Sequence, residues 1–336
     1  MHTLVTGGGG FLGRYIVEQL VARGDQVRSF GRGKYPELTA LGVEVVRGDV
    51  RDREAVAAAC RGIECAIHTA AVAGIGGPWR RFREINVRGT ENVLAACRIQ
   101  GVSRLVFTGS PSTVFAGEDQ CGVNESAPYG LEWLERHDAH YSRSKALAEQ
   151  LVLGADEPGC LATCSLRPHL IWGPRDAQLI PRLIARARRG RLRRVGDGAN
   201  VVDVTYVENA AAAHLSAADK LAEANSPVAG RAYFLSQGEP VNCWQWIDEV
   251  LALADLPPVA KSISFHTAWR IGAVCEAAFR LAGIEREPPM TRFLSAQLAK
   301  SHWFDISAAR RDLGYEPRVS TSEGMRRLGQ WLRQSA

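Results

Sequence analysis

A tyrosine and a lysine stand four residues apart in the segment YSRSK, residues 141–145. If the segment is helical, both side chains lie on one face about one turn apart, with the ammonium near the phenol. A nearby cation favours the phenolate, so Lys145 is expected to lower the pKa of Tyr141 toward a range in which it can pass a proton. An exposed helical tyrosine and lysine with no catalytic role would have the same spacing. The pattern indicates catalysis only if the rest of the fold positions these side chains beside a substrate.

A glycine-rich loop near the N-terminus could provide part of that scaffold. In TLVTGGGGFLGRYIVEQL, residues 3–20, an apolar strand pattern is followed by Gly7, Gly10 and Gly13 and then by a helical pattern. Glycines at this spacing allow a tight turn, close approach of backbone N–H groups to a pyrophosphate, and close strand–helix packing. Four consecutive glycines could also form a plain turn. We predict a dinucleotide site that includes Phe11 and Leu12 at the start of the helix.

The end of the second predicted strand bears on the choice of dinucleotide. An acidic residue there would bind the 2′-hydroxyl of NAD. The sequence FGRGK has Gly31 at about that position, with Arg32 and Lys34 beside it. Two cations suit a 2′-phosphate, so NADP(H) is favoured and NAD(H) is the alternative. Arg32 and Lys34 could instead be solvated loop charges in an enzyme that accepts both cofactors.

Composition narrows the remaining classes. The chain has 336 residues, a formal charge of +5 and acidic residues throughout, which gives no sign of a nucleic-acid-binding stripe. Its eight cysteines form no C-x-x-C pair and no His or Cys set has metal-site spacing, so we expect free thiols and no structural metal. The longest uncharged run, residues 65–79, is too short to span a bilayer. We therefore expect a cytoplasmic protein without a transmembrane segment.

Strand and helix patterns alternate along the first 175 residues. Continuous apolar strands that alternate with helices predict an α/β, doubly wound parallel sheet (Rossmann fold). The predicted Rossmann domain spans residues 1–175 and is completed by segments near 202–236, while 176–336 form mainly a smaller, mostly helical substrate-binding cap. The predicted strands lie at 2–6, 26–30, 43–49, 64–71, 104–110, 161–167 and 232–236. The predicted helices lie at 11–23, 52–60, 80–99, 178–189, 207–222, 242–254, 268–282 and 321–333, with a further short helix after the second strand.

The order of several motifs resembles the extended short-chain dehydrogenase/reductase superfamily. The motifs are Gly7/Gly10/Gly13, GDV at 48–50, HTAA at 68–71, NVRGT at 86–90, TGSPS at 108–112, YSRSK at 141–145 and LRPHLIWGP at 166–174. The segments SPSTVFAG, RPHLIWGPRDAQLIPRLI and VDVTYVENAAAAH are similar to the 3β-hydroxysteroid dehydrogenase branch. Within it the chain resembles sterol-4-carboxylate 3-dehydrogenases and, through GRAYFLSQGEP and EPPMTRFLSAQL as well, bacterial 2-alkyl-3-oxoalkanoate reductases of olefin and β-lactone biosynthesis.

This resemblance implies roles for individual residues. Tyr141 would be the catalytic acid/base, Lys145 would hold the nicotinamide ribose, and Ser110 would hydrogen-bond the reacting oxygen. Thr108 and Ser112 are alternatives to Ser110, and Gly109 stands where relatives often have another serine. The cofactor contacts implied by the resemblance are Asp49 and Val50 at the adenine, Ala70 and Ala71 at the pyrophosphate-side ribose, and Pro168 at the nicotinamide.

Two further polar residues in these motifs have open roles. Asn86 could be a capping or turn amide, or it could act in the site directly. His169 is interpreted as a packed or loop histidine rather than a catalyst.

The activity implied is NADPH-dependent reduction of a 3-oxo group on a long-chain, lipid-like substrate. The alternatives are a steroid or sterol-4-carboxylate dehydrogenase, a sugar-nucleotide epimerase or dehydratase, and a sensor that binds NADP(H) without turnover. Stoichiometric NADPH loss would separate a reductase from an epimerase.

The cap leaves three questions about contacts. Its aromatic residues could line a lipid pocket or form a small core, and the arginines between 182 and 194 could bind a substrate carboxylate or form a solvated helix face. The apolar helix pattern near 268–282 could line the pocket, touch a membrane surface or bind a partner enzyme. The superfamily resemblance also implies a homodimer formed through the helix at 80–99.

Overall fold

A seven-stranded parallel sheet forms the centre of the larger part of the molecule. In this computed structural model, which describes residues 1–335, the strand order is β12-β7-β5-β4-β1-β2-β3. Every residue of β4 is buried, as expected for a parallel strand covered on both faces. The predicted doubly wound fold is confirmed. The strands are β1 His2–Thr6, β2 Gln26–Gly31, β3 Glu44–Arg47, β4 Cys65–His68, β5 Arg104–Thr108, β7 Ala162–Pro168 and β12 Arg231–Leu235.

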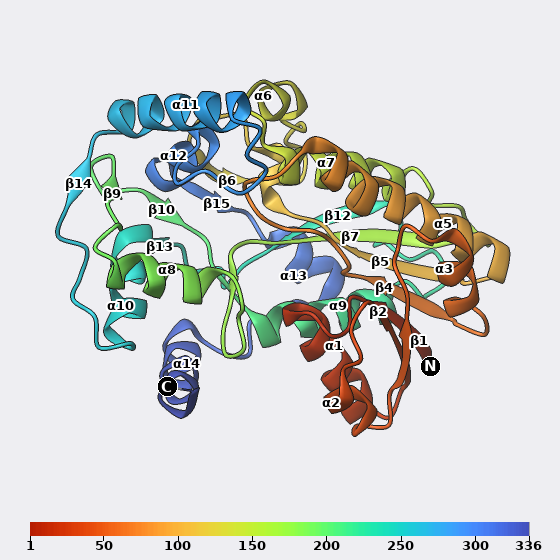
Figure 1. Cartoon of the computed structure of the whole chain (residues 1–336). Coiled ribbons are helices and arrows are strands. Elements are labelled where there is room, and N and C mark those ends of the chain that lie inside the picture. The colour runs from red at the N-terminus through yellow and green to blue at the C-terminus, as the bar shows by residue number, and fades with distance from the viewer. Residues whose placement is uncertain (336) are drawn as a thin grey trace.

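Two helical layers cover the sheet, one on each face (Figure 1). Separate clusters of buried apolar side chains fill the two interfaces. One layer contains α1 Phe11–Ala22, α9 Val207–Lys220 and α13 Ser307–Leu313; the other contains α3 Arg53–Ala59, α5 Gly89–Gln100 and α7 His140–Leu153. The short helix α2 Pro36–Thr39 follows β2.

The long helix predicted at 80–99 is not uniform. It consists of α4 Trp79–Phe82, the π-helical segment η1 Arg83–Arg88 and α5. A Cβ atom on Gly89 would lie 2.7 Å from Val50 Cγ2, so the helix passes very close to the loop after β3 here. A π-helical turn inside an α-helix adds a residue locally and re-aims the side chains that follow, and no periodicity in the sequence announces it.

A second, smaller sheet lies in the cap and was not predicted. Its order is β13-β10-β15-β6, built from strands of two to four residues. The strands are β6 Gln120–Val123, β10 Val201–Val202, β13 Val241–Asn242 and β15 His302–Phe304; two further pairs join β8 Ile171–Trp172 to β11 Thr205–Tyr206 and β9 Arg194–Val195 to β14 Ser262–Ile263. The remaining helices are the 3-10 helix η2 Pro111–Val114, α6 Leu131–Arg136, α8 Leu179–Arg188, α10 Cys243–Ala252, α11 Phe265–Leu281, α12 Arg292–Ala299 and α14 Thr321–Ser335.

The cap has a hydrophobic core of its own. Trp172, Trp244 and Trp246 are buried in it, so these three tryptophans belong to packing rather than to a pocket. All eight cysteines are free thiols, and Cys121 and Cys160 are exposed. Within residues 1–335, no helix is long and apolar enough to cross a membrane. In the same part of the chain, no cluster of three His, Cys, Asp or Glu side chains could hold a metal ion.

Candidate active site

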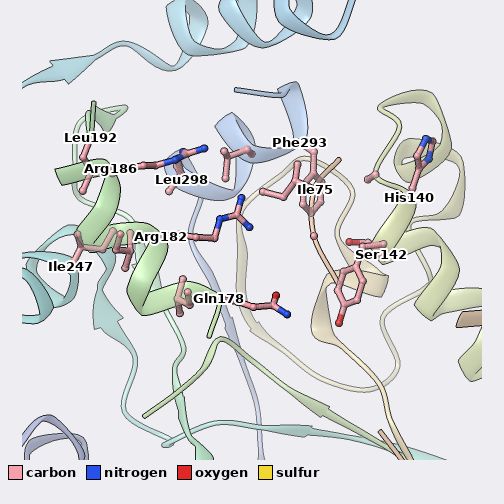
Figure 2. Close-up of a pocket in the computed structure, with 16 residues that line it drawn as sticks. Ile75, His140, Ser142, Gln178, Arg182, Arg186, Leu192, Ile247, Phe293 and Leu298 are labelled. Atoms are coloured by element: carbon pink, nitrogen blue, oxygen red, sulfur yellow. The ribbon is translucent and has the colours of Figure 1, made fainter. Parts of the chain in front are cut away.

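A cavity of about 280 Å³ lies between the N-terminal end of α7 and helix α8. Its lining is mostly apolar and includes Tyr141. Ser142, the neighbour of Tyr141, stands on one side of the cavity, while Gln178, Arg182 and Arg186 stand on the other (Figure 2). The apolar lining comes from Ile75, Leu179, Leu183, Leu192, Ile247, Phe293, Leu294 and Leu298. Phe293 is thus one cap aromatic that faces a pocket.

Tyr141 lines this cavity and interacts with Ser110, which comes from a different element. Tyr141 is in the first turn of α7, and Ser110 follows β5 and caps the helix η2. Burial raises the pKa of Tyr141, and a hydrogen bond with the Ser110 side chain lowers it. The predicted lowering of the Tyr141 pKa by Lys145 is therefore wrong for this structure, because burial of the phenol outweighs the other effects and the serine is the group that opposes it.

Ser110 begins a chain of three hydroxyl groups. Its Oγ lies 2.9 Å from Ser112 Oγ, and Ser142 Oγ donates to Ser112 Oγ at 2.9 Å. Thr108 Oγ1 instead lies 2.8 Å from Nε2 of the buried His214, whose Nδ1 bonds the carbonyl of Ala210. Of the three candidates for contact with the reacting oxygen, Ser110 is the one that interacts with Tyr141.

Lys145 lies one turn further along α7 and is buried. Burial lowers the pKa of its ammonium to about 7, and the carboxylate of Glu149 opposes this shift. Its Nζ lies 3.9 Å from the centre of the Phe107 ring, a cation–π contact in a desolvated place. An ammonium with this pKa can exchange a proton near neutral pH.

Glu149 continues the same face of α7 and was missed at the sequence level. It is fully buried and pairs with Arg167, which donates from Nε at 3.0 Å and from Nη2 at 2.6 Å to Oε1. Ser165 Oγ donates to the other carboxylate oxygen. The available signal was spacing, because Glu149 follows Lys145 by four residues, as Lys145 follows Tyr141.

The buried Glu149 also explains Gly109. A Cβ atom at this position would lie 2.5 Å from Glu149 Oε2 and 2.6 Å from Ser165 Oγ. The space that a serine side chain would need is therefore already filled by the buried ion pair.

Asn86 ties three elements together. Its side-chain oxygen accepts from Val72 N at 2.8 Å, and its amide nitrogen donates to Val72 O at 3.0 Å and to Ser144 Oγ at 2.9 Å. These bonds join the π-helical segment to α7 and to the loop after β4. The hydrogen bonds of the Asn86 amide thus help to position α7, the helix that carries Tyr141.

The glycine loop forms a cradle at the carboxyl ends of β1 and β4. Gly7 has φ +74°, and a Cβ there would lie 2.9 Å from Ala70 N. A Cβ on Gly13 would lie 2.2 Å from Gly7 O. Helix α1 begins after Gly10 without a side-chain cap, so the N–H groups of its first turn are available to an anion. Because β1 and β4 are neighbours at the point where the strand order reverses, this cradle fits the pyrophosphate of a dinucleotide.

The remaining predicted cofactor residues lie around this cradle. Phe11 and Leu12 open α1, and Ala70 N donates to Thr6 Oγ1 at 3.3 Å, with Ala71 exposed next to it. Pro168 ends β7. His169, which follows it, is buried and bonds His302 Nδ1 at 2.6 Å, outside the cavity lining.

The loop after β2 presents its cations to solvent. Arg32 and Lys34 are both exposed, and no carboxylate of residues 1–334 lies within ion-pair distance of either side chain. Tyr35 was not predicted here: it has φ +46°, and its ring covers the glycine loop so closely that a Cβ on Gly9 would lie 2.2 Å from it.

Asp49 and Val50, in the loop after β3, differ in what their side chains contact. The carboxylate of Asp49 accepts from the Arg51 guanidinium, which lowers the pKa of Asp49, whereas Val50 is buried behind it.

The sequence as a whole matches one family of known proteins. The model of the 3-beta hydroxysteroid dehydrogenase/isomerase family covers residues 4–263. The chain belongs to this family. Its family relatives include a 2-alkyl-3-oxoalkanoate reductase of Stenotrophomonas maltophilia, 49% identical over 98% of both chains. A reductase of the same name from Shewanella oneidensis is 45% identical over 97% of this chain and 85% of its own length.

The comparisons also include a more distant relative in sequence and two solved structures with a similar fold. The human sterol-4-alpha-carboxylate 3-dehydrogenase, decarboxylating, is 32% identical over 98% of this chain and 87% of its own length. The crystal structure of gox2253 superposes with a TM-score of 0.79 at 25% identity, covering 99% of this chain and 98% of its own. MoeE5 in complex with UDP-glucose and NAD shares the fold with a TM-score of 0.76 at 24% identity, covering 100% of this chain and 99% of its own. As a member of the 3-beta hydroxysteroid dehydrogenase/isomerase family, the chain is an NAD(P)-dependent oxidoreductase with an extended short-chain dehydrogenase/reductase fold.

Proposed function

We propose that the protein is an NADPH-dependent reductase that converts a 2-alkyl-3-oxoalkanoate to the 2-alkyl-3-hydroxyalkanoate. The observation that carries the proposal is that Tyr141 lines a mostly apolar cavity and interacts with Ser110, in a chain 49% identical to a reductase of that name. An apolar cavity with a few convergent polar groups suits a lipid-like ketone.

The residues of the chain have separate tasks in this reaction. The reduced nicotinamide, when bound, supplies a hydride to the carbonyl carbon. Tyr141 donates its phenolic proton to the carbonyl oxygen, which becomes the product hydroxyl, while Ser110 hydrogen-bonds that oxygen as negative charge develops on it. Lys145, one turn further along α7, would hold the ribose of the nicotinamide.

The preference for NADPH rests on the loop after β2. Gly31 ends that strand, so no carboxylate stands there to repel a 2′-phosphate, and Arg32 and Lys34 are exposed without a carboxylate partner among residues 1–334. Arginine and lysine both bind phosphate oxygens well, the former with two parallel hydrogen bonds.

The deciding experiment follows absorbance at 340 nm with purified protein and a 2-alkyl-3-oxo fatty acid. NADPH and NADH are compared, and a 3-oxosteroid is assayed beside the acyl ketone. We expect stoichiometric loss of NADPH with the acyl ketone and a clearly lower kcat/KM with NADH. Turnover only with NAD(H) and the steroid would be consistent with the Tyr141 mechanism but would contradict both the proposed substrate and the proposed cofactor. Absence of NADPH loss across varied ketones would favour a sensor.

We further propose a cytoplasmic homodimer that pairs through α5 and α7. Ile99 on α5 and Leu151 on α7 are exposed, with 62% and 36% of their surface accessible, although both are large and apolar. Apolar side chains on two adjacent helices fit a surface that a second copy covers. Size-exclusion chromatography with light scattering tests this, and a monomer at micromolar concentration would overturn it.

A further inference from the structure

We propose that Arg182, assisted by Gln178 and Arg186, binds the carboxylate of the substrate. The inference rests on the proposed function and adds the residues that would select a free acid over an ester. It concerns the wall of the cavity opposite Tyr141.

The three side chains form one stripe along α8. Arg182 and Arg186 are four residues apart on one face of α8, Gln178 is the residue just before the helix, and all three line the cavity. The carboxylate of Asp176 fixes the start of α8, accepting from Gln178 N at 2.8 Å and from Ile180 N at 2.8 Å. The stripe is therefore held by a capped helix end.

Arg182 has unused hydrogen-bonding capacity. Its Nη2 donates to Glu287, whereas its Nε and Nη1 have no acceptor among residues 1–334. Figure 2 shows the Arg182 side chain reaching into the cavity and the Gln178 amide pointing toward Ser142, the neighbour of Tyr141. A single ion pair thus orients the guanidinium and leaves the rest of its fork for a ligand.

The charge on this wall is positive. Arg186 donates to the backbone carbonyl of Pro289 at 3.2 Å, and no carboxylate of residues 1–334 pairs with it. Burial and the charge of Arg182 lower the pKa of Arg186, and the charge of Glu287 opposes this shift. Two guanidinium groups thus lie near a single carboxylate. An otherwise apolar cavity with this excess of positive charge complements an amphipathic anion.

The geometry matches the chemistry of a 3-oxo acid. In such a substrate the carboxylate carbon is two bonds from the carbonyl carbon that reacts. If the carbonyl oxygen is bound at Tyr141 and the carboxylate points across the cavity, the carboxylate would face the wall that carries Gln178, Arg182 and Arg186. The alkyl chains are left to the leucines and Phe293 that line the same space.

The test compares a 2-alkyl-3-hydroxyalkanoate with its methyl ester, oxidised with NADP⁺, because the hydroxy acid does not lose CO₂ as a 3-oxo acid does. We expect the Arg182→Gln variant to lose roughly 10- to 100-fold in kcat/KM for the acid, the range for a hydrogen bond to a charged group, and to keep its value for the ester. The rise in melting temperature that the acid produces in the NADP⁺-bound protein should shrink in parallel. Glu287→Gln keeps an oxygen that can accept from Arg182 but removes the competing negative charge, so kcat/KM for the acid should not fall.

Arg189→Gln is the matched control, because Arg189 is exposed at the end of the same helix and outside the cavity lining. It should change neither substrate. An equal loss for acid and ester in Arg182→Gln would overturn the carboxylate role in favour of a structural one, and an unchanged acid preference would also overturn it. A wild-type protein inactive on both compounds would instead overturn the proposed function and this inference with it.

Discussion

Across the cavity, helix α7 carries the charged side chains of Lys145 and Glu149 inside the protein, whereas helix α8 carries Arg182 at the rim. Lys145 and Glu149 on α7 are 3% and 0% exposed, and the Arg182 side chain on α8 is 42% exposed. Glu149 is held by Arg167 and Ser165 of β7, and Lys145 contacts the Phe107 ring of β5. Arg182 is held by one ion pair.

This difference separates two tasks that one cavity must perform. Proton transfer needs groups whose pKa values and positions are fixed before substrate arrives, and a desolvated, fully partnered setting provides that. Recognition of a flexible, charged lipid tolerates a solvated side chain that adjusts to the ligand. Substitutions on α7 should therefore harm chemistry and folding, and those on α8 should change selectivity.

The largest effect should come from the phenol itself. Tyr141→Phe removes the proton donor but little volume, so we expect kcat to fall by roughly 10³-fold, within the range of general acid catalysis, with the Kd for NADPH unchanged. Stopped-flow turnover and fluorescence titration of NADPH measure the two quantities. Undiminished turnover would show that another group donates the proton.

A smaller effect, on folding, should follow from filling the space beside Glu149. Gly109→Ser would place its Cβ 2.5 Å from the Glu149 carboxylate, and overpacking next to a buried ion pair should lower the free energy of unfolding by about 3 kcal/mol. Urea denaturation measures this. The comparison variant on the other wall, Arg182→Gln, should change it by less than about 1 kcal/mol, as for other half-exposed ion pairs. Equal losses would remove the contrast between the walls.

The smallest effect should be a pH dependence of stability caused by Lys145. Burial lowers its pKa in the folded protein from 10.5 to about 7, so between these values the unfolded chain binds more protons than the folded one. The free energy of unfolding should therefore rise with pH in this window, by about 2 kcal/mol between pH 7 and pH 9, and should not change further on this account below pH 7.

Lys145→Met should lack that rise, while Arg182→Gln should keep it. Parallel slopes for wild type and Lys145→Met would mean that the ammonium is not desolvated in the folded state.

The central fold was predictable because local patterns determine it. Each strand of the large sheet is an apolar run followed by a helical repeat, and β12 was found for the same reason 60 residues after β7. The four-stranded cap sheet was not predictable, since strands as short as Val201–Val202 have no periodicity and pair with residues far away.

The site was predictable as a set of residue types but not as a set of environments. The spacing of Tyr141 and Lys145 pointed to their chemistry, yet the burial that raises the pKa of Tyr141 and lowers the pKa of Lys145 comes from tertiary packing, which includes the Phe107 ring against Lys145. Likewise, nothing in the run of arginines separates Arg182, which lines the cavity, from the exposed Arg189. Only the position of α8 against α7 makes that distinction.

The pairing of β6 with β15 affects the order in which the protein can be completed during synthesis. Gln120 lies opposite His302, so a strand made early on the ribosome must wait for one made 182 residues later. Phe304 stacks its ring on Phe234, and Ile306 and Leu313 pack into the core beside α9. The nascent dinucleotide-binding sheet thus stays open on that side until the last tenth of the chain emerges, and the cap closes as one of the final steps rather than as an independent unit.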